Sequence, residues 1–180
     1  MKKYLINLFA ILLFNGILIQ LIAQDIVLPA PDTTGGKPLM QALNERQTTR
    51  SFTSDSLTRQ QLSDLLWAGF GINRSDQKKR TAPSAMNWQE IDMYVTMQGG
   101  SYMYDAESHS LKFINNKDLR KETGSQSFVA DAALNILYVA DMGKRGIKEG
   151  DMIKDSDLFM TYSDAAFIAQ NIYLYCASAN

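Results

Sequence analysis

The sequence predicts an α+β domain, because helix-like and strand-like segments both occur but do not follow one another in regular alternation. A doubly wound α/β fold would require strands and helices to alternate along the chain. The 180 residues are 46% hydrophobic and 21% charged, which is enough apolar material for one core and excludes disorder of the whole chain. We therefore expect a single folded domain of mixed structure.

The chain begins with a segment that reads as a secretory signal peptide. Lys2 and Lys3 precede an almost uncharged run that ends at Ala23, and polar residues follow at once. We predict a signal peptide over residues 1–23 and an exported, periplasmic protein. The alternative is a retained membrane anchor, since an apolar run of about 20 residues is long enough to span a bilayer.

Charge and metal-ligand composition exclude several classes of protein. The formal net charge is −1 and no long basic run occurs, so no nucleic-acid partner is expected. A single cysteine, Cys176, and a single histidine, His109, leave no disulfide framework and no ligand set for zinc. We expect His109 on the surface and Cys176 buried in the closing helix.

Residues 24–37 contain Pro29, Pro31, Gly35 and Gly36, and we predict a linker or N-terminal arm there, with the domain itself over residues 38–180. Apolar residues at helical spacing predict a short helix over residues 39–46.

The second helix has clear signals at both ends. Thr58 and Gln61 have the spacing of a capping box, and Gly71 is a suitable end. One face of this helix is apolar and is expected in the core; its members are Leu62, Leu65, Leu66 and Phe70.

The middle of the chain predicts strands. Residues 72–80 are polar and read as a loop, residues 91–97 alternate as a half-buried strand, and shorter strands follow around residues 102–104 and 111–114. The continuous apolar run 133–140 predicts a strand buried on both faces.

The closing helix is predicted to begin near residues 161–164 and to run through Cys176. We expect it to leave uncovered an apolar face that contains Ile168, Ile172, Tyr173 and Cys176, and to lie at a homodimer interface.

Three segments together resemble the nitroreductase family. Residues 45–52 (ERQTTRSF) resemble its Arg-Arg-Ser-x-Arg-x-Phe opening, and residues 80–90 (RTAPSAMNWQE) resemble its Pro-Ser-x-x-Asn-x-Gln segment. Residues 164–174 (DAAFIAQNIYL) are similar to its Asp-x-x-x-x-x-Gln-Asn-x-x-Leu helix. Residues 65–68 (LLWA) with 71–74 (GINR) are closest to the SagB-like branch.

The resemblance implies an FMN-dependent oxidoreductase that moves a hydride to or from a small organic substrate. It further implies a homodimer with a central, mostly antiparallel sheet flanked by helices and with flavins at the subunit interface. The flavin carries the chemistry, so no catalytic residue and no metal are expected, and NAD(P)H is a possible electron donor. The implied cofactor-binding residues are Arg46, Thr48, Arg50, Pro83, Ser84, Asn87 and Gln89.

The chemistry of these residues suits the cofactor. Guanidinium groups such as those of Arg46 and Arg50, four positions apart at a helix end, bind phosphate oxygens bidentately. The amide of Asn87 can donate and accept at the pyrimidine edge of the ring. The alternatives are surface ion pairs of the two arginines with Glu45 or Asp55, and turn capping by Asn87 and Gln89.

Family members usually continue beyond the closing helix with a loop, a strand and basic residues at the flavin, whereas this sequence stops at Asn180. We therefore predict that the 180-residue form is purified mostly without flavin and that a chain extended by the family's usual C-terminal segment would bind it. An exported protein also meets little NAD(P)H, so another donor is expected. The alternative functions are an exported, flavin-free binding or structural protein and, within the SagB-like branch, a peptide azoline oxidase.

Overall fold

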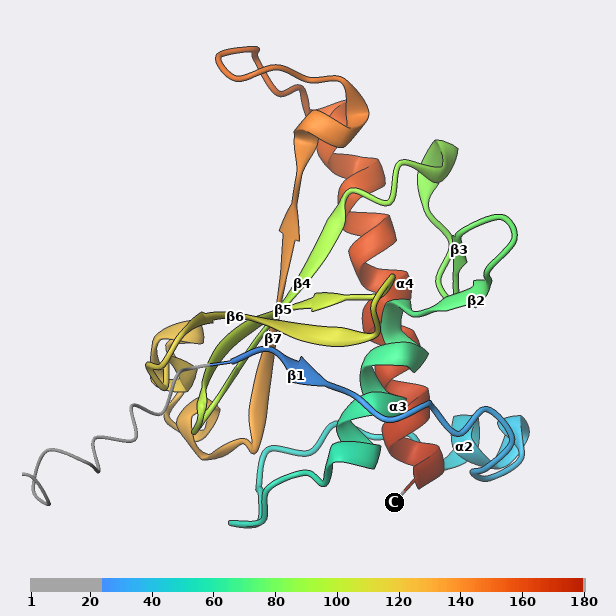
Figure 1. Cartoon of the computed structure of the whole chain (residues 1–180), viewed down its shortest axis with the longest axis vertical. Coiled ribbons are helices and arrows are strands. Elements are labelled where there is room, and N and C mark those ends of the chain that lie inside the picture. Colours follow the sequence, from blue (N-terminus) through green and yellow to red (C-terminus); the bar gives the residue numbers. More distant parts are fainter. Residues whose placement is uncertain (1–23, 180) are drawn as a thin grey trace, which may run out of the picture.

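A computed structural model describes residues 24–179, so the predicted signal peptide lies outside the described residues. A five-stranded sheet in the order β1-β6-β5-β4-β7 packs beside two long helices, α3 and α4 (Figure 1). The sheet strands are β1 (Ile26–Val27), β4 (Ile91–Met97), β5 (Gly100–Asp105), β6 (Ser110–Asn115) and β7 (Leu134–Ala140). The helices are α2 (Leu39–Glu45), α3 (Arg59–Phe70) and α4 (Asp155–Ala179). The fold is completed by a hairpin of β2 (Ile72–Arg74) and β3 (Lys79–Arg80) and by the short turns η1 (Ala85–Asn87), η2 (Arg120–Thr123), η3 (Ser127–Asp131) and η4 (Met142–Arg145).

Every neighbouring pair of strands in the sheet is antiparallel. The longest pairing joins β4 to β7 and runs from Ile91 opposite Ala140 to Met97 opposite Leu134. Gly100 begins β5 at φ 136°, and a Cβ there would lie 2.6 Å from a backbone oxygen, so only glycine fits this turn. The predicted α+β class with an antiparallel sheet flanked by helices is confirmed.

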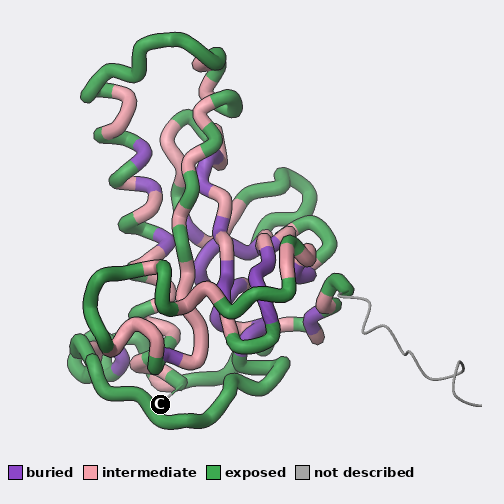
Figure 2. The backbone as a smooth tube through the Cα atoms, turned by 90° about the vertical axis from the view of Figure 1, so that its left-hand side faces the viewer, coloured by how far each residue is buried: buried purple, intermediate pink, exposed green. Residues whose placement is uncertain are grey.

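Helix α3 begins as its sequence predicts. The Thr58 side chain accepts from the Gln61 amide, and the Gln61 side chain accepts from the Thr58 amide at 2.9 Å, which completes the capping box. The predicted apolar face of the helix is buried, and Leu66 is fully enclosed. Together with Ile168 of α4 and the inner side chains of the sheet, it forms the core at the centre of the molecule (Figure 2).

Helix α4 begins at Asp155, well before the predicted start near residues 161–164. The Asp157 carboxylate accepts the Lys154 backbone amide at 3.0 Å, and acidic side chains at a helix N-terminus interact favourably with its dipole. Thr161 lies inside the helix, where its hydroxyl donates to the Asp157 carbonyl instead of capping a terminus.

Three predictions of burial or exposure were wrong. Strand β7 packs one face, with Ile136 and Tyr138, against the core, so Leu137 and Val139 on the other face stay 37% and 45% exposed although the run was predicted to be buried on both faces. Cys176 was predicted to be buried and is exposed. On α4, Ile168 is fully buried, so it does not belong to the apolar face that was predicted to be uncovered. Both elements present apolar surface that this one chain does not cover.

The N-terminal arm lies against the domain. Strand β1 pairs with β6, Leu28 is buried, and the Lys37 amide donates to the Ser178 hydroxyl at 2.7 Å, near the end of α4. The polar residues 72–80, predicted as a loop, instead form the β2–β3 hairpin. Among residues 24–179, no helix has the length and apolar character needed to cross a membrane.

His109 was predicted to lie on the surface, and the structure instead places it in a chain of hydrogen bonds under the arm. The Ser63 hydroxyl donates to the Pro29 carbonyl at 2.6 Å, so its contact with His109 Nε2 at 2.7 Å requires Nε2 to carry the proton. The Tyr104 hydroxyl then donates to Nδ1 at 2.9 Å. The neutral imidazole therefore joins the arm, α3 and the sheet.

This arrangement predicts a pH-dependent stability. Burial lowers the pKa of His109 below its ordinary value of 6.5, so the unfolded chain takes up the proton first as the pH falls. We expect the free energy of unfolding to be full above pH 6.5 and to decrease below it. Urea unfolding between pH 8 and pH 5 measures this, and His109→Gln should remove that part of the dependence because the chain has one histidine. An unchanged pH profile in the variant would contradict the assignment.

Candidate functional site

The predicted phosphate-binding residues follow α2. The helix ends at Glu45, and Arg46 is its C-cap, with its amide donating to the Ala42 carbonyl. Residues 46–50 are not helical, so the expectation that Arg46 and Arg50 share one helical turn is wrong. Arg46 is half-buried, whereas Thr48 and Arg50 are exposed.

A hollow of about 610 Å³ lies beside this segment. Arg46 and Lys37 line it from one side, and Tyr173 and Cys176 of α4 line it from the other. Glu45 pairs with Lys37 at 2.7 Å, and among the described ion pairs neither Arg46 nor Arg50 has a carboxylate partner. The alternative of surface pairs with Glu45 or Asp55 is therefore not formed in this structure. Arg46 and Lys37 supply cationic donors to the hollow, Glu45 also lines it, and Thr48 and Arg50 lie outside its lining.

The second predicted segment, residues 83–89, contains η1 and has an unusual backbone. Met86, Asn87 and Gln89 have φ values of 51°, 56° and 51°, a left-handed conformation that residues with a Cβ rarely adopt. Pro83 and Asn87 are exposed, and Ser84 is half-buried. Such clusters of backbone strain are found at functional sites.

The side chain of Gln89 braces this loop from within the chain. Its Oε1 accepts from Arg80 Nε at 2.8 Å, and its Nε2 donates to the Lys78 carbonyl at 3.0 Å. Its Nε2 also lies 3.3 Å from Asn87 Oδ1. The amide of Gln89 thus fixes the loop to the β2–β3 hairpin, and Asn87 is exposed.

Two buried carboxylates lie under the loop, and the sequence had given them no role. Asp164 of α4 is 3% exposed and accepts the Ala85 amide at 2.8 Å. Glu90 is fully buried, the Ser84 hydroxyl donates to its Oε2 at 3.4 Å, and the Thr161 hydroxyl oxygen lies 3.4 Å from its Oε1. The signal in the sequence that pointed to Asp164 was the family-like segment 164–174, which opens with this acid.

The two predicted segments lie apart in a single chain. The loop meets α4 at Asp164, and the hollow beside Arg46 meets α4 at Tyr173 and Cys176. From Asp164 to Cys176 is twelve helical residues, which corresponds to about 18 Å along the axis. Figure 1 shows α2 near the C-terminal end of α4 and the green loop beyond β3 beside its N-terminal half. One chain therefore keeps the two predicted half-sites, residues 46–50 and 83–89, apart from each other.

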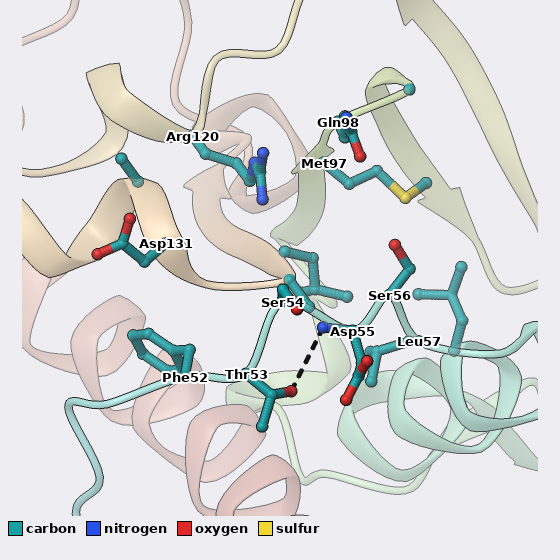
Figure 3. Close-up of a pocket in the computed structure, with 15 residues that line it drawn as sticks. Phe52, Thr53, Ser54, Asp55, Ser56, Leu57, Met97, Gln98, Arg120 and Asp131 are labelled. Atoms are coloured by element: carbon teal, nitrogen blue, oxygen red, sulfur yellow. Dashed lines mark hydrogen bonds between the residues drawn. The ribbon is translucent and has the colours of Figure 1, made fainter.

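A further hollow, of about 690 Å³, includes none of the predicted residues (Figure 3). Phe52 and Leu57 line one side, and Met97 lies across from them. Its arginine, Arg120, is held by Asp118 at 2.8 Å and by the Ala132 carbonyl at 2.7 Å. Within residues 24–179, no cluster of three acidic, histidine or cysteine side chains is placed to hold a metal ion.

The structure is an α+β domain in which an antiparallel sheet packs against two helices. A basic segment and a strained polar loop lie beside the longer helix. The profile described as "Nitroreductase family" matches residues 43–180. The chain belongs to the nitroreductase family and is therefore an oxidoreductase by family.

Known proteins of this kind resemble it in sequence and fold. A protein of Methanocaldococcus jannaschii, provisionally named a nitroreductase, is 26% identical over 150 residues, which are 78% of this chain and 73% of that protein. A crystal structure from Ralstonia eutropha, with the same provisional name, has a TM-score of 0.79 and 42% identity and covers 87% of this chain and 72% of its own. A structure from Desulfovibrio desulfuricans in complex with FMN shares the fold alone, at a TM-score of 0.50 and 19% identity over 78% of this chain and 62% of its own.

Proposed function

We propose that this protein is an FMN-dependent oxidoreductase whose flavin binds between two copies of the chain. In this proposal, Arg46, Thr48 and Arg50 of one copy hold the phosphate. The loop 83–89 of the second copy, with Asn87 exposed, holds the ring. The observation that carries the proposal is the distance of about 18 Å along α4 between the two half-sites of one chain.

A two-fold axis across α4 would bring the half-sites together. If two α4 helices cross in opposite directions, the C-terminal half of one lies against the N-terminal half of the other. Exposed aromatic side chains along α4 support such a contact: Phe159, Tyr162, Phe167 and Tyr173 are 67%, 70%, 49% and 53% exposed. Apolar surface of this kind on one helix is typical of a subunit interface.

The residues of the chain would bind and orient the cofactor. FMN, when bound, supplies the hydride transfer. The guanidinium groups of Arg46 and Arg50 neutralise the phosphate, the Thr48 hydroxyl donates to it, and the Asn87 amide meets the pyrimidine edge of the ring. No side chain is assigned a general acid or base role, and the substrate class is a small organic molecule that accepts or gives a hydride.

The electron donor follows from where the protein works. We place this activity outside the cytoplasm because Lys2 and Lys3 precede an apolar run of signal-peptide type. NAD(P)H is scarce there, so we propose another reduced donor or return of the electrons to oxygen.

Titration with added FMN tests the function. Bound flavin should show quenched fluorescence and a shifted absorption band, with one FMN per chain at saturation. The flavin-free alternative predicts free-FMN fluorescence at every protein concentration, and that result would overturn the proposed function.

The dimer is tested at α4. Phe167→Asp should shift the protein from dimer to monomer, because it places a charge in the proposed apolar contact. Light scattering at micromolar concentration measures the mass. The control is Ile114→Asp on β6, where the side chain is 45% exposed and far from α4 in sequence. A monomeric unmodified chain, or a Phe167→Asp variant that remains dimeric, would count against the interface.

A further inference from the structure

The loop that carries Asn87 is held in its strained shape by groups that lie beneath it. Three of its residues, Met86, Asn87 and Gln89, have left-handed backbone conformations, and none of them is glycine. This conformation is unfavourable for residues with a Cβ, so the surrounding structure must impose it.

The first contact comes from α4. Asp164 lies nine residues after the start of the helix, so its carboxylate caps no terminus of α4. Its Oδ2 accepts the backbone amide of Ala85 at 2.8 Å, and the residue is 3% exposed. A hydrogen bond from an amide to an ionised acceptor is stronger than a neutral one, and burial protects it from competition by water.

The second contact joins the other end of the loop to the interior. The Ser84 hydroxyl accepts a hydrogen bond from the backbone amide of Gln89 at 2.8 Å and donates one to the carboxylate of Glu90, which is fully buried. The guanidinium of Arg145 lies over the ring of Trp88, 4.4 Å from its centroid. The hydrogen bond between Ser84 and Gln89 joins the two ends of the loop, and the contact with Arg145 holds Trp88 beside η4.

We infer that Asp164 is a positioning residue that sets the shape of the flavin-ring loop through the Ala85 amide. Asp164 itself is buried and does not contact a ligand from this position. Its link to flavin rests on the proposed function, whereas its effect on the loop does not. The role of the carboxylate is to place a hydrogen-bond acceptor beside the Ala85 amide. A side chain of the same shape that keeps an acceptor oxygen should therefore replace it, and an apolar side chain should not.

Asp164→Leu and Asp164→Asn separate these possibilities. Leucine removes the acceptor at similar volume, and asparagine keeps one. In FMN titrations of the full chain, we expect Asp164→Leu to raise the Kd about 10- to 100-fold, the equivalent of one lost charge-assisted hydrogen bond. Asp164→Asn should restore most of the affinity. The matched control is Glu122→Leu, an exposed acid on η2.

Ala85→Pro tests the same bond from its other partner and keeps the inference testable if Asp164→Leu does not fold. Ala85 is the first residue of η1, a position that accepts proline, and Ser84 before it is already extended at φ −138° and ψ 134°. The substitution removes the amide donor while leaving α4 unchanged. We expect a similar rise in Kd, with no further rise when it is combined with Asp164→Leu.

A readout without flavin distinguishes this inference from the proposed function. The chain has two tryptophans, so Trp67→Phe leaves Trp88 as the reporter of the loop. Asp164→Leu and Ala85→Pro should shift Trp88 emission and increase its quenching by acrylamide, whereas Asp164→Asn should not. If these shifts occur but the unmodified protein binds no FMN, the proposed function fails and the positioning role stands. Unchanged Trp88 emission in both variants would overturn the positioning role, whatever the affinity for FMN.

Discussion

Replacing Arg50 by alanine should weaken FMN binding by about 1.5–3 kcal/mol, because a charge-assisted contact to phosphate is lost. Arg50 is exposed and has no described carboxylate partner, so the loss should appear in ligand binding and not in folding. Fluorescence titration at low and high salt measures the effect, and the salt dependence of the Kd should fall as well.

Lys117→Ala is a suitable control for charge, since Lys117 is an exposed base between β6 and η2. It lowers the net charge by the same amount at a site outside both half-sites. If Arg50→Ala and Lys117→Ala gave the same Kd as the unmodified chain, the phosphate assignment would be wrong.

Ile168→Ala should lower the free energy of unfolding by about 2–5 kcal/mol, the usual cost of a cavity in a packed core. Ile168 is fully buried and belongs to the core cluster that joins α3, α4 and the sheet. Urea unfolding at constant protein concentration measures the change. Ile114→Ala, at a side chain 45% exposed, should cost much less, and equal losses in the two variants would contradict this description of the core.

Local signals in the sequence predicted much of the fold. The Thr58 and Gln61 capping box and the alternating strand over residues 91–97 depend on neighbouring residues, and the structure has them where predicted. The predicted start of α4 and the predicted burial of β7 were wrong. The first depends on contacts between distant segments and the second on whether one or both faces of a strand are covered, which periodicity does not report.

The site shows the same division. The motif segments and their order identified the family. The separation of the two segments along α4 could not be predicted from their spacing in sequence. Nor could the bond between Asp164 and Ala85, which joins residues 79 positions apart.

The shared flavin site is tested most directly by mixing two defective chains. One chain carries Arg46→Ala and Arg50→Ala, and the other carries Ser84→Ala and Asn87→Ala, so each lacks one half-site. In a mixed dimer, one of the two flavin sites should combine the intact segment of one chain with the intact segment of the other, and the second site should combine the two defective segments. We expect about one quarter of the sites in an equal mixture to regain the affinity of the unmodified protein. If FMN titration of the mixture equals the average of the two defective proteins, the flavin does not bind between two copies of this chain.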